Sequence, residues 1–143
     1  MSYTRVCIHY VWATKNRMPV LTSTIRNSLF IHIRRNAEDK KIMIDALNGH
    51  IDHVHCLVWL QVTQSIDQIA KLLKGESAHW FNNRSGISKI KLQWQENYFA
   101  VSVSEMMLPI IRGYIQNQEI HHQKITFDEA YTQFFNNYNF DDL

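Results

Sequence analysis

The central part of the sequence, residues 42–60, reads IMIDALNGHIDHVHCLVWL. Residues 42–47 are mainly apolar, and residues 53–60 alternate in character, a pattern typical of β-strands. Asn48-Gly49 lies between them and is the strongest hairpin signal in the chain, because both residue types tolerate the positive φ angles of a tight turn. The stretch therefore predicts an antiparallel hairpin.

Apolar periodicity predicts further elements on both sides of this hairpin. Strands are expected at residues 4–14, 42–47, 53–60 and 98–103, and helices at residues 22–37, 66–75 with a shorter piece through 81, about 104–122 and 127–137. The order β, α, β, β, α, β followed by helices is that of a split βαβ unit. We expect an α+β, ferredoxin-like fold: an antiparallel sheet with two helices on one face and an additional C-terminal helix. Since no linker or repeat interrupts the pattern, residues 1–143 are expected to form a single domain.

The composition excludes several classes of protein. Of 143 residues, 45% are apolar and 20% are charged, and 15 Lys and Arg against 13 Asp and Glu leave a net charge of +2. These values exclude a histone-like, a strongly acidic and a disordered chain. The sequence shows neither a charged leader before an apolar stretch nor an apolar run of the roughly 18 to 20 residues that span a bilayer. A cytoplasmic location without membrane association is expected.

His53-Val54-His55 is the first candidate for chemistry. On a strand, residues two apart project from the same face, so both imidazoles could reach one metal ion while Val54 enters the core on the other face. Asp52 could orient a ligating imidazole by accepting its second N–H. The alternative is two partly exposed strand histidines without a ligand, which the chance frequency of this short motif keeps open.

Tyr114 and Gln118 form the second candidate pair. They are four residues apart, so on a helix they lie on one face. A Gln carbonyl is a neutral oxygen ligand, and a Tyr hydroxyl is an oxygen nucleophile once its proton is removed. The alternative is a packing tyrosine beside a solvated glutamine.

Basic residues cluster in the middle of the chain, where tryptophan and phenylalanine are interleaved with them. Such a pattern suits single-stranded nucleic acid, because cations follow the phosphates and aromatic rings stack on bases. The candidate DNA-binding residues are Lys71, Lys74, Arg84, Lys89 and Lys91, with a second patch at Arg34 and Arg35. The alternative is a mixed surface whose aromatic side chains face the core.

Taken together, these segments resemble the single-tyrosine HUH transposases of the smallest bacterial insertion sequences. Five segments in the order of that family carry the resemblance: residues 8–17 (IHYVWATKNR), 52–55 (DHVH), 71–75 (KLLKG), 99–104 (FAVSVS) and 114–118 (YIQNQ) followed by two histidines.

The resemblance implies a function and a role for each candidate. Tyr114 would be the catalytic nucleophile on the C-terminal helix, and His53, His55 and Gln118 would bind Mg²⁺ or Mn²⁺. Such a neutral ligand set leaves positions open for phosphate oxygens, unlike a closed zinc site. The resemblance implies a transposase that cleaves and rejoins single-stranded DNA through a 5′-phosphotyrosine and recognises hairpins at the element ends. It also implies a homodimer, in which the Tyr114 helix completes either its own site or that of the partner.

Two other functions are compatible with the same residues. A non-catalytic ferredoxin-like module that binds nucleic acid or a small effector would need neither Tyr114 nor a metal. A related HUH nickase of replication or conjugation would share the chemistry, although no helicase or primase domain is expected within these 143 residues.

Overall fold

The computed structural model describes residues 2–84, 90–118, 129 and 132. Its elements along the chain are β1 (Val6–Ala13), a 3-10 turn (Lys15–Arg17), α1 (Ser23–Asp39), β2 (Met43–His50), β3 (His53–Leu60), α2 (Ile66–Asn82), β4 (Phe99–Val103), a second 3-10 turn (Glu105–Met107) and α3 (Leu108–Gln116). No helix in these ranges is long and apolar enough to cross a membrane.

The four strands form one sheet in the order β2-β3-β1-β4, and every neighbouring pair is antiparallel. The parallel pairs β1/β2 and β3/β4 are each separated by one strand and joined by one helix. This is the split βαβ topology, so the predicted ferredoxin-like fold is confirmed.

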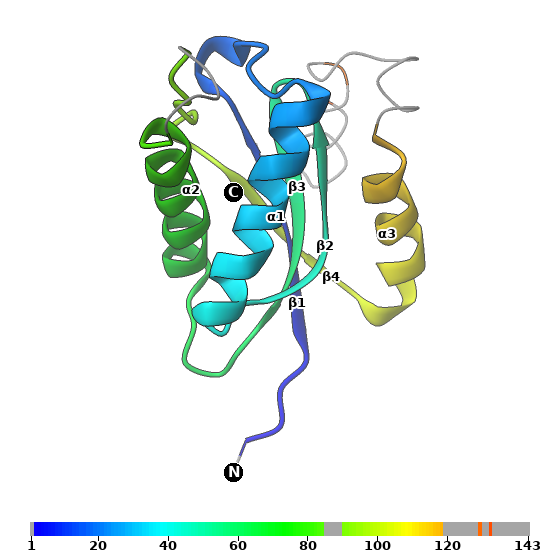
Figure 1. Cartoon of the computed structure of the whole chain (residues 1–143). Helices are drawn as coiled ribbons and strands as arrows, with labels where there is room; N and C mark the ends of the chain where they lie inside the picture. Colours follow the sequence, from blue (N-terminus) through cyan, green and yellow to red (C-terminus); the bar gives the residue numbers. More distant parts are fainter. Residues whose placement is uncertain (1, 85–89, 119–128, 130–131, 133–143) are drawn as a thin grey trace.

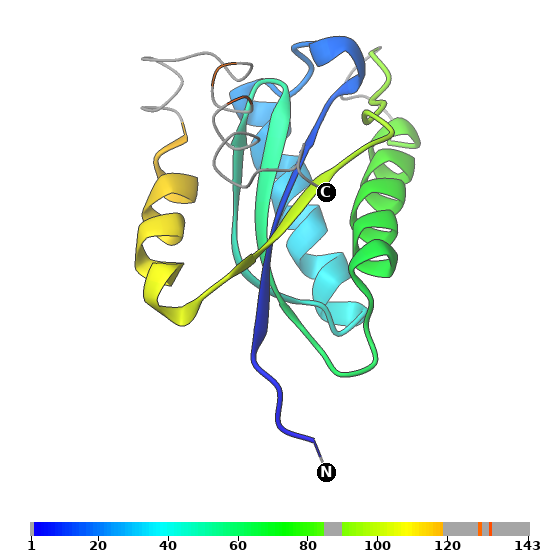
Figure 2. The same ribbon diagram turned by 180° about the vertical axis from the view of Figure 1, so that it is seen from behind.

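The two faces of the sheet are covered by different helices (Figures 1 and 2). Alternate residues of β1, among them Tyr10 and Trp12, pack with α1 and α2 in the larger core. On the opposite face Cys7 and Leu57 pack with α3, which lies on the β2 side of the molecule. Because side chains of a strand alternate, the odd-numbered residues of β1 and β3 lie on the face of the sheet on which α3 packs.

The predicted turn at Asn48-Gly49 is wrong. Both residues belong to β2, and the two-residue turn is Ile51-Asp52. A Cβ atom on Gly49 would stand 2.2 Å from the main-chain oxygen of His53. The glycine therefore serves close approach between β2 and β3 and not the geometry of a turn.

Helix boundaries also differ from the prediction at two places. The Ser65 side chain caps α2 as expected, by accepting a 3.1 Å hydrogen bond from the Gln68 N–H. However, α2 does not stop near Gly75 but runs on to Asn82 as one helix. The helix of Tyr114 begins at Leu108, in line with Pro109 in its first turn. Its predicted extension to residue 122 and the last predicted helix fall largely outside the described residues.

The two glycines predict opposite effects of an added methyl group. In Gly75→Ala the new Cβ would meet no atom within 4 Å. We expect the free energy of unfolding to rise by about 0.5–1 kcal/mol, because alanine loses less backbone entropy in a helix. In Gly49→Ala it should fall by about 1–3 kcal/mol through overpacking. Urea denaturation of both variants measures the contrast, and a stabilised Gly49→Ala would contradict the close approach in the sheet.

Candidate active site

His53 and His55 lie side by side on β3 and face α3, as the alternation predicted. Their ring centroids are 5.1 Å apart and the ring planes are nearly perpendicular. The two side chains are 0% and 1% exposed, so they are not the partly exposed strand histidines of the alternative interpretation. Polar groups so deeply buried need partners, and these come from the β2–β3 turn, from α3 and from β1.

Both ring nitrogens of His53 meet oxygen atoms. Its Nδ1 is 2.8 Å from Oδ1 of Asp52, and its Nε2 is 3.0 Å from Oε1 of Gln118. A carboxylate oxygen only accepts hydrogen bonds, so Nδ1 donates its N–H to Asp52, and Nε2 is the ring atom that lies next to the Gln118 oxygen. Asp52 thus contacts one nitrogen of the imidazole, and Gln118 lies at the other.

The amide of Gln118 has a defined orientation. Its Nε2 donates a 2.9 Å hydrogen bond to the main-chain oxygen of Tyr114, which only accepts. The carbonyl oxygen, which is the atom able to bind a metal ion, must therefore face His53.

On α3, the ring of Tyr114 contacts His55. Its ring stands edge-on to His55, with 5.4 Å between the centroids. Burial raises the pKa of the phenol to about 12, and a hydrogen bond with the Gln118 side chain opposes that shift. The hydroxyl is therefore protonated at neutral pH and has to lose its proton during any attack.

His9 is a part of the site that the sequence analysis missed. Its Nε2 lies 2.9 Å from Nδ1 of His55, the two rings are stacked, and the His9 side chain is 0% exposed. Burial lowers the pKa of His9 to about 4, so the ring is neutral at physiological pH. The signal in the sequence was its odd position in the first strand, which shares a sheet face with His55 only once the β1/β3 register is known.

β2 holds α3 in place through two anchors. Asp45 is the extra residue of a β-bulge, and its carboxylate accepts hydrogen bonds of 2.8 and 2.6 Å from Arg112 on α3 and of 3.0 Å from the Trp59 indole. At the other end, the Asn48 side chain donates to the main-chain oxygen of Ile115 at 2.9 Å. Tyr114 lies on the turn of α3 that these anchors fix.

The Asp45 anchor predicts an acid-dependent loss of stability. Hydrogen bonds from Arg112 are the main cause that lowers the pKa of Asp45 in the folded chain, so its contribution exists above the unfolded value of about 3.9 and disappears as the pH falls through the folded value. We expect Asp45→Asn to destabilise the protein at pH 7, with the difference from wild type shrinking below about pH 4. Urea denaturation at pH 7, 5 and 3 measures this. Asp39→Asn, exposed at the end of α1, is the control, and a difference that does not vary with pH would contradict the prediction.

The donor set of the site fits a divalent cation with oxygen and nitrogen ligands. Two cis ligands of an octahedral ion at roughly 2.1 Å are about 3 Å apart, and His53 Nε2 and Gln118 Oε1 are separated by 3.0 Å. In the described part of the chain no group of three His, Cys, Asp or Glu side chains is placed to hold a metal ion. A metal site at His53 and His55 would need the Gln118 oxygen as a third ligand.

The basic residues proposed for DNA binding differ in their exposure to solvent and in the groups that they contact. Lys74 donates 2.8 Å hydrogen bonds to the main-chain oxygens of Gln95 and Glu96, so it supports the loop before β4. Lys71 pairs with Asp67 one turn away. Arg34, Arg35 and Lys91 are exposed, Arg84 is half-buried, and Lys89 lies outside the described residues. Their contact with DNA stays a prediction.

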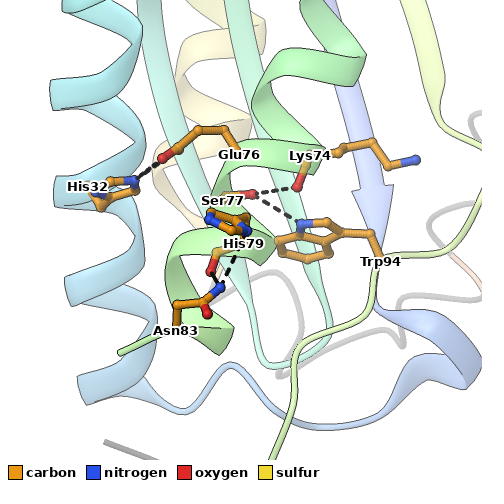
Figure 3. Close-up of polar contacts among 7 residues, drawn as sticks. All are labelled: His32, Lys74, Glu76, Ser77, His79, Asn83 and Trp94. Atoms are coloured by element: carbon orange, nitrogen blue, oxygen red, sulfur yellow. Dashed lines mark hydrogen bonds and ion pairs between the residues drawn. The ribbon is translucent and has the colours of Figure 1, made fainter. Parts of the chain in front are cut away.

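The interleaved aromatic side chains mostly face other parts of the protein. Phe81 is buried, and Trp80 is stacked on His32 of α1 with 4.0 Å between the centroids. His32 in turn contacts the Glu76 carboxylate, as Figure 3 shows. The Trp94 indole donates a hydrogen bond to the hydroxyl of Ser77 on α2. The packing alternative therefore describes Trp80 and Phe81 better than an exposed stacking surface does.

Known proteins resemble this chain in sequence and in fold. The profile of the IS200-like transposases matches residues 2–118. The ISDra2 transposase TnpA of Deinococcus radiodurans is 30% identical over 114 residues, which cover 77% of this chain and 81% of that protein.

Two solved structures share the fold. A chain from Deinococcus radiodurans R1 described as a transposase aligns with a TM-score of 0.63 and 28% identity, over 82% of this chain and 93% of that chain. A REP-associated tyrosine transposase bound to a REP hairpin aligns with a TM-score of 0.64 and 16% identity, over 85% of this chain and 72% of that chain. The matching residues 2–118 include the whole candidate site, and the chain belongs to the IS200-like transposase family of DNA-processing enzymes.

Proposed function

We propose that this protein cleaves and rejoins single-stranded DNA through a covalent 5′-phosphotyrosine on Tyr114. One observation carries the proposal: Tyr114 on α3 and Gln118 just after that helix lie against His53 and His55 in a buried site. These residues are about 60 positions apart in the chain, and a packing tyrosine would not need a buried polar cluster beside it.

The proposed reaction at Tyr114 consumes neither water nor ATP, because each bond to phosphorus that breaks is replaced by a new one. The Tyr114 oxygen forms a bond to the scissile phosphorus and loses its proton, while the bond from phosphorus to the 3′ oxygen breaks and that oxygen leaves as a 3′-OH. A second 3′-OH then attacks the phosphotyrosine, which rejoins the strands and releases the tyrosine. Burial raises the pKa of Tyr114, and neutralising the charge on the phosphate nearby would favour the loss of its proton during attack.

His53, His55 and Gln118 would hold Mg²⁺ or Mn²⁺. When bound, the ion would polarise the scissile phosphate and stabilise the charge that develops there. Asp52 would keep the His53 ring oriented through Nδ1, so that Nε2 and the Gln118 oxygen point to the same place.

His9 would do for His55 what Asp52 does for His53. For His55 to bind a metal through Nε2, its Nδ1 must carry the proton, and the neutral His9 Nε2 would accept it. We expect His9→Ala to weaken Mn²⁺ binding about 10–100-fold. In His9→Gln the side-chain oxygen reaches the position of Nε2 and should restore most of the affinity. Electron paramagnetic resonance of added Mn²⁺ measures both variants, and an unchanged affinity in His9→Ala would exclude this role.

The substrate we propose is a single-stranded DNA hairpin at the ends of a mobile element. Two findings support it: the REP-associated transposase of the same fold was solved bound to a REP hairpin, and exposed cations lie on α1 and after α2. We also propose a homodimer. Met106 in the second 3-10 turn and Ile110 on α3 are 89% and 63% exposed, a pair of apolar side chains suited to an interface.

A covalent-capture experiment tests the function. Wild-type protein is mixed with a single-stranded DNA library of random sequence and Mn²⁺, and adducts that resist SDS are counted by gel shift. We expect adducts with single strands, none with the same library as duplex, and none with chelator. A non-catalytic binding module would bind the library and form no adduct, which would refute the proposal.

A further inference from the structure

A pocket lies at the end of the sheet where the candidate site also lies. Its volume is about 360 Å³, within the range of ligand sites. Its lining includes Lys15, Asn16, Arg17, Trp94, Gln95 and Glu96. The connection to the site is short: Thr14, which also lines the pocket, donates its N–H to the main-chain oxygen of Asp52 at 2.8 Å, and Asp52 contacts His53.

The first wall of this pocket has an unusual backbone. Asn16 and Arg17 have φ angles of 56° and 55°, in the left-handed region. That conformation costs an arginine roughly 1–2 kcal/mol. The Thr14 side chain holds the turn by donating to the main-chain oxygen of Met18 at 2.8 Å. Strain of this kind is concentrated at functional sites, and here it directs two consecutive polar side chains to one pocket.

The second wall is fixed before any ligand arrives. The Lys15 N–H donates to the oxygen of Gln93 and the Gln95 N–H to that of Ala13, at 2.9 and 2.8 Å. Lys74 of α2 holds the oxygens of Gln95 and Glu96 from behind. The Trp94 indole is fixed by its hydrogen bond to Ser77 (Figure 3).

The chemistry of the lining matches a nucleotide. Two cations suit a phosphate, an indole suits the face of a base, and an amide beside a carboxylate suits an edge that carries an amino group. The Gln95 side chain is exposed toward solvent and can present both an acceptor and a donor. Among the bases, adenine has the edge that a glutamine amide pairs with through two hydrogen bonds.

We propose that this pocket is a nucleotide subsite, which holds one unpaired nucleotide of the DNA strand beside the catalytic site and reads adenine through Gln95. The subsite rests on the proposed function, because it places a neighbour of the scissile phosphate. Lys15 and Arg17 contribute affinity for the phosphate without base preference, and Gln95 contributes the preference.

The test is a binding selection with the Tyr114→Phe protein, which separates recognition from cleavage. The random single-stranded library is selected for binding to this protein, and the bound strands are sequenced. The selection is repeated with two double variants, in which Tyr114→Phe is combined with Gln95→Ala or with Gln93→Ala. Gln93 is the matched control, since it is the same residue two positions away and does not line the pocket. We expect one position enriched in adenine, about tenfold less enrichment with Gln95→Ala, and no change with Gln93→Ala. Lys15→Ala should weaken binding of all sequences equally.

The outcomes separate the two proposals. An adenine preference that is absent, or that survives Gln95→Ala, overturns the subsite. Covalent capture on the wild-type protein decides the proposed function independently, because it asks only whether adducts form. If adducts form and the base preference does not depend on Gln95, the proposed cleavage is supported and the subsite is refuted. If a Gln95-dependent preference appears without adducts, the pocket still reads adenine, but the proposed cleavage is refuted and the pocket belongs to a binding protein.

Discussion

The Tyr114→Phe protein should form no DNA adduct above background and should still bind single-stranded DNA with an affinity within about twofold of wild type. The substitution removes only the hydroxyl oxygen. The ring keeps its edge-on contact with His55, and the main-chain oxygen of Tyr114 still accepts from Gln118. Without that oxygen the phosphorus–tyrosine bond cannot form, so the loss should be complete and not graded. Adducts are measured on SDS gels with labelled single-stranded DNA, and binding by fluorescence anisotropy.

Tyr98→Phe provides the matched control for this substitution. Tyr98 is also half-buried, but its hydroxyl donates to Asp67 at the surface of α2, away from His53 and His55. We expect the adduct yield of Tyr98→Phe to equal that of wild type. Adducts at the wild-type level in Tyr114→Phe would show that another residue is the nucleophile.

His53→Ala should abolish both Mn²⁺ binding at the site and metal-dependent cleavage. The ring connects Asp52 to Gln118, and its removal deletes one ligand and leaves the Gln118 oxygen without its 3.0 Å partner. Loss of an outer partner of a ligand costs about 10–100-fold in metal affinity, and loss of a ligand itself should exceed that. Isothermal titration with Mn²⁺ and the adduct assay provide two separate measurements.

Folding of the variant has to be checked, because an emptied buried position also costs stability. Circular dichroism at the assay temperature identifies an unfolded protein. His79→Ala serves as the control: His79 is exposed near the end of α2 and should be neutral in both assays. Full cleavage by His53→Ala, or by wild type in the presence of chelator, would exclude the metal role.

The strand pattern predicted the arrangement of His53 and His55 because alternation is a local property. The same pattern could not reveal His9. A histidine in the apolar run of the first strand is indistinguishable from a core residue until the β1/β3 register puts it next to His55. Such a pairing depends on residues almost 50 positions apart, which no local signal encodes.

The turn at Asn48-Gly49 failed for a related reason. Turn propensity describes isolated segments, whereas Gly49 is required by the His53 backbone across the strand pair, and Asn48 serves α3, more than 60 residues later. The helix break predicted at Gly75 failed because packing on the sheet outweighs a cost of about 1 kcal/mol. The order of elements was predicted correctly despite these errors, because it depends on periodicity summed over long segments.

The polar anchors of α3 lie on β2, so the proposed catalytic centre is assembled from two separately held parts of the fold. Asp45 and Asn48, which hold the helix, come from one edge strand, while the histidines belong to the interior of the sheet. Tyr114 and Gln118 are therefore held next to the histidines, or displaced from them, together with α3. In the proposed mechanism, displacing α3 would remove the metal ligand Gln118 and the nucleophile Tyr114 at the same time.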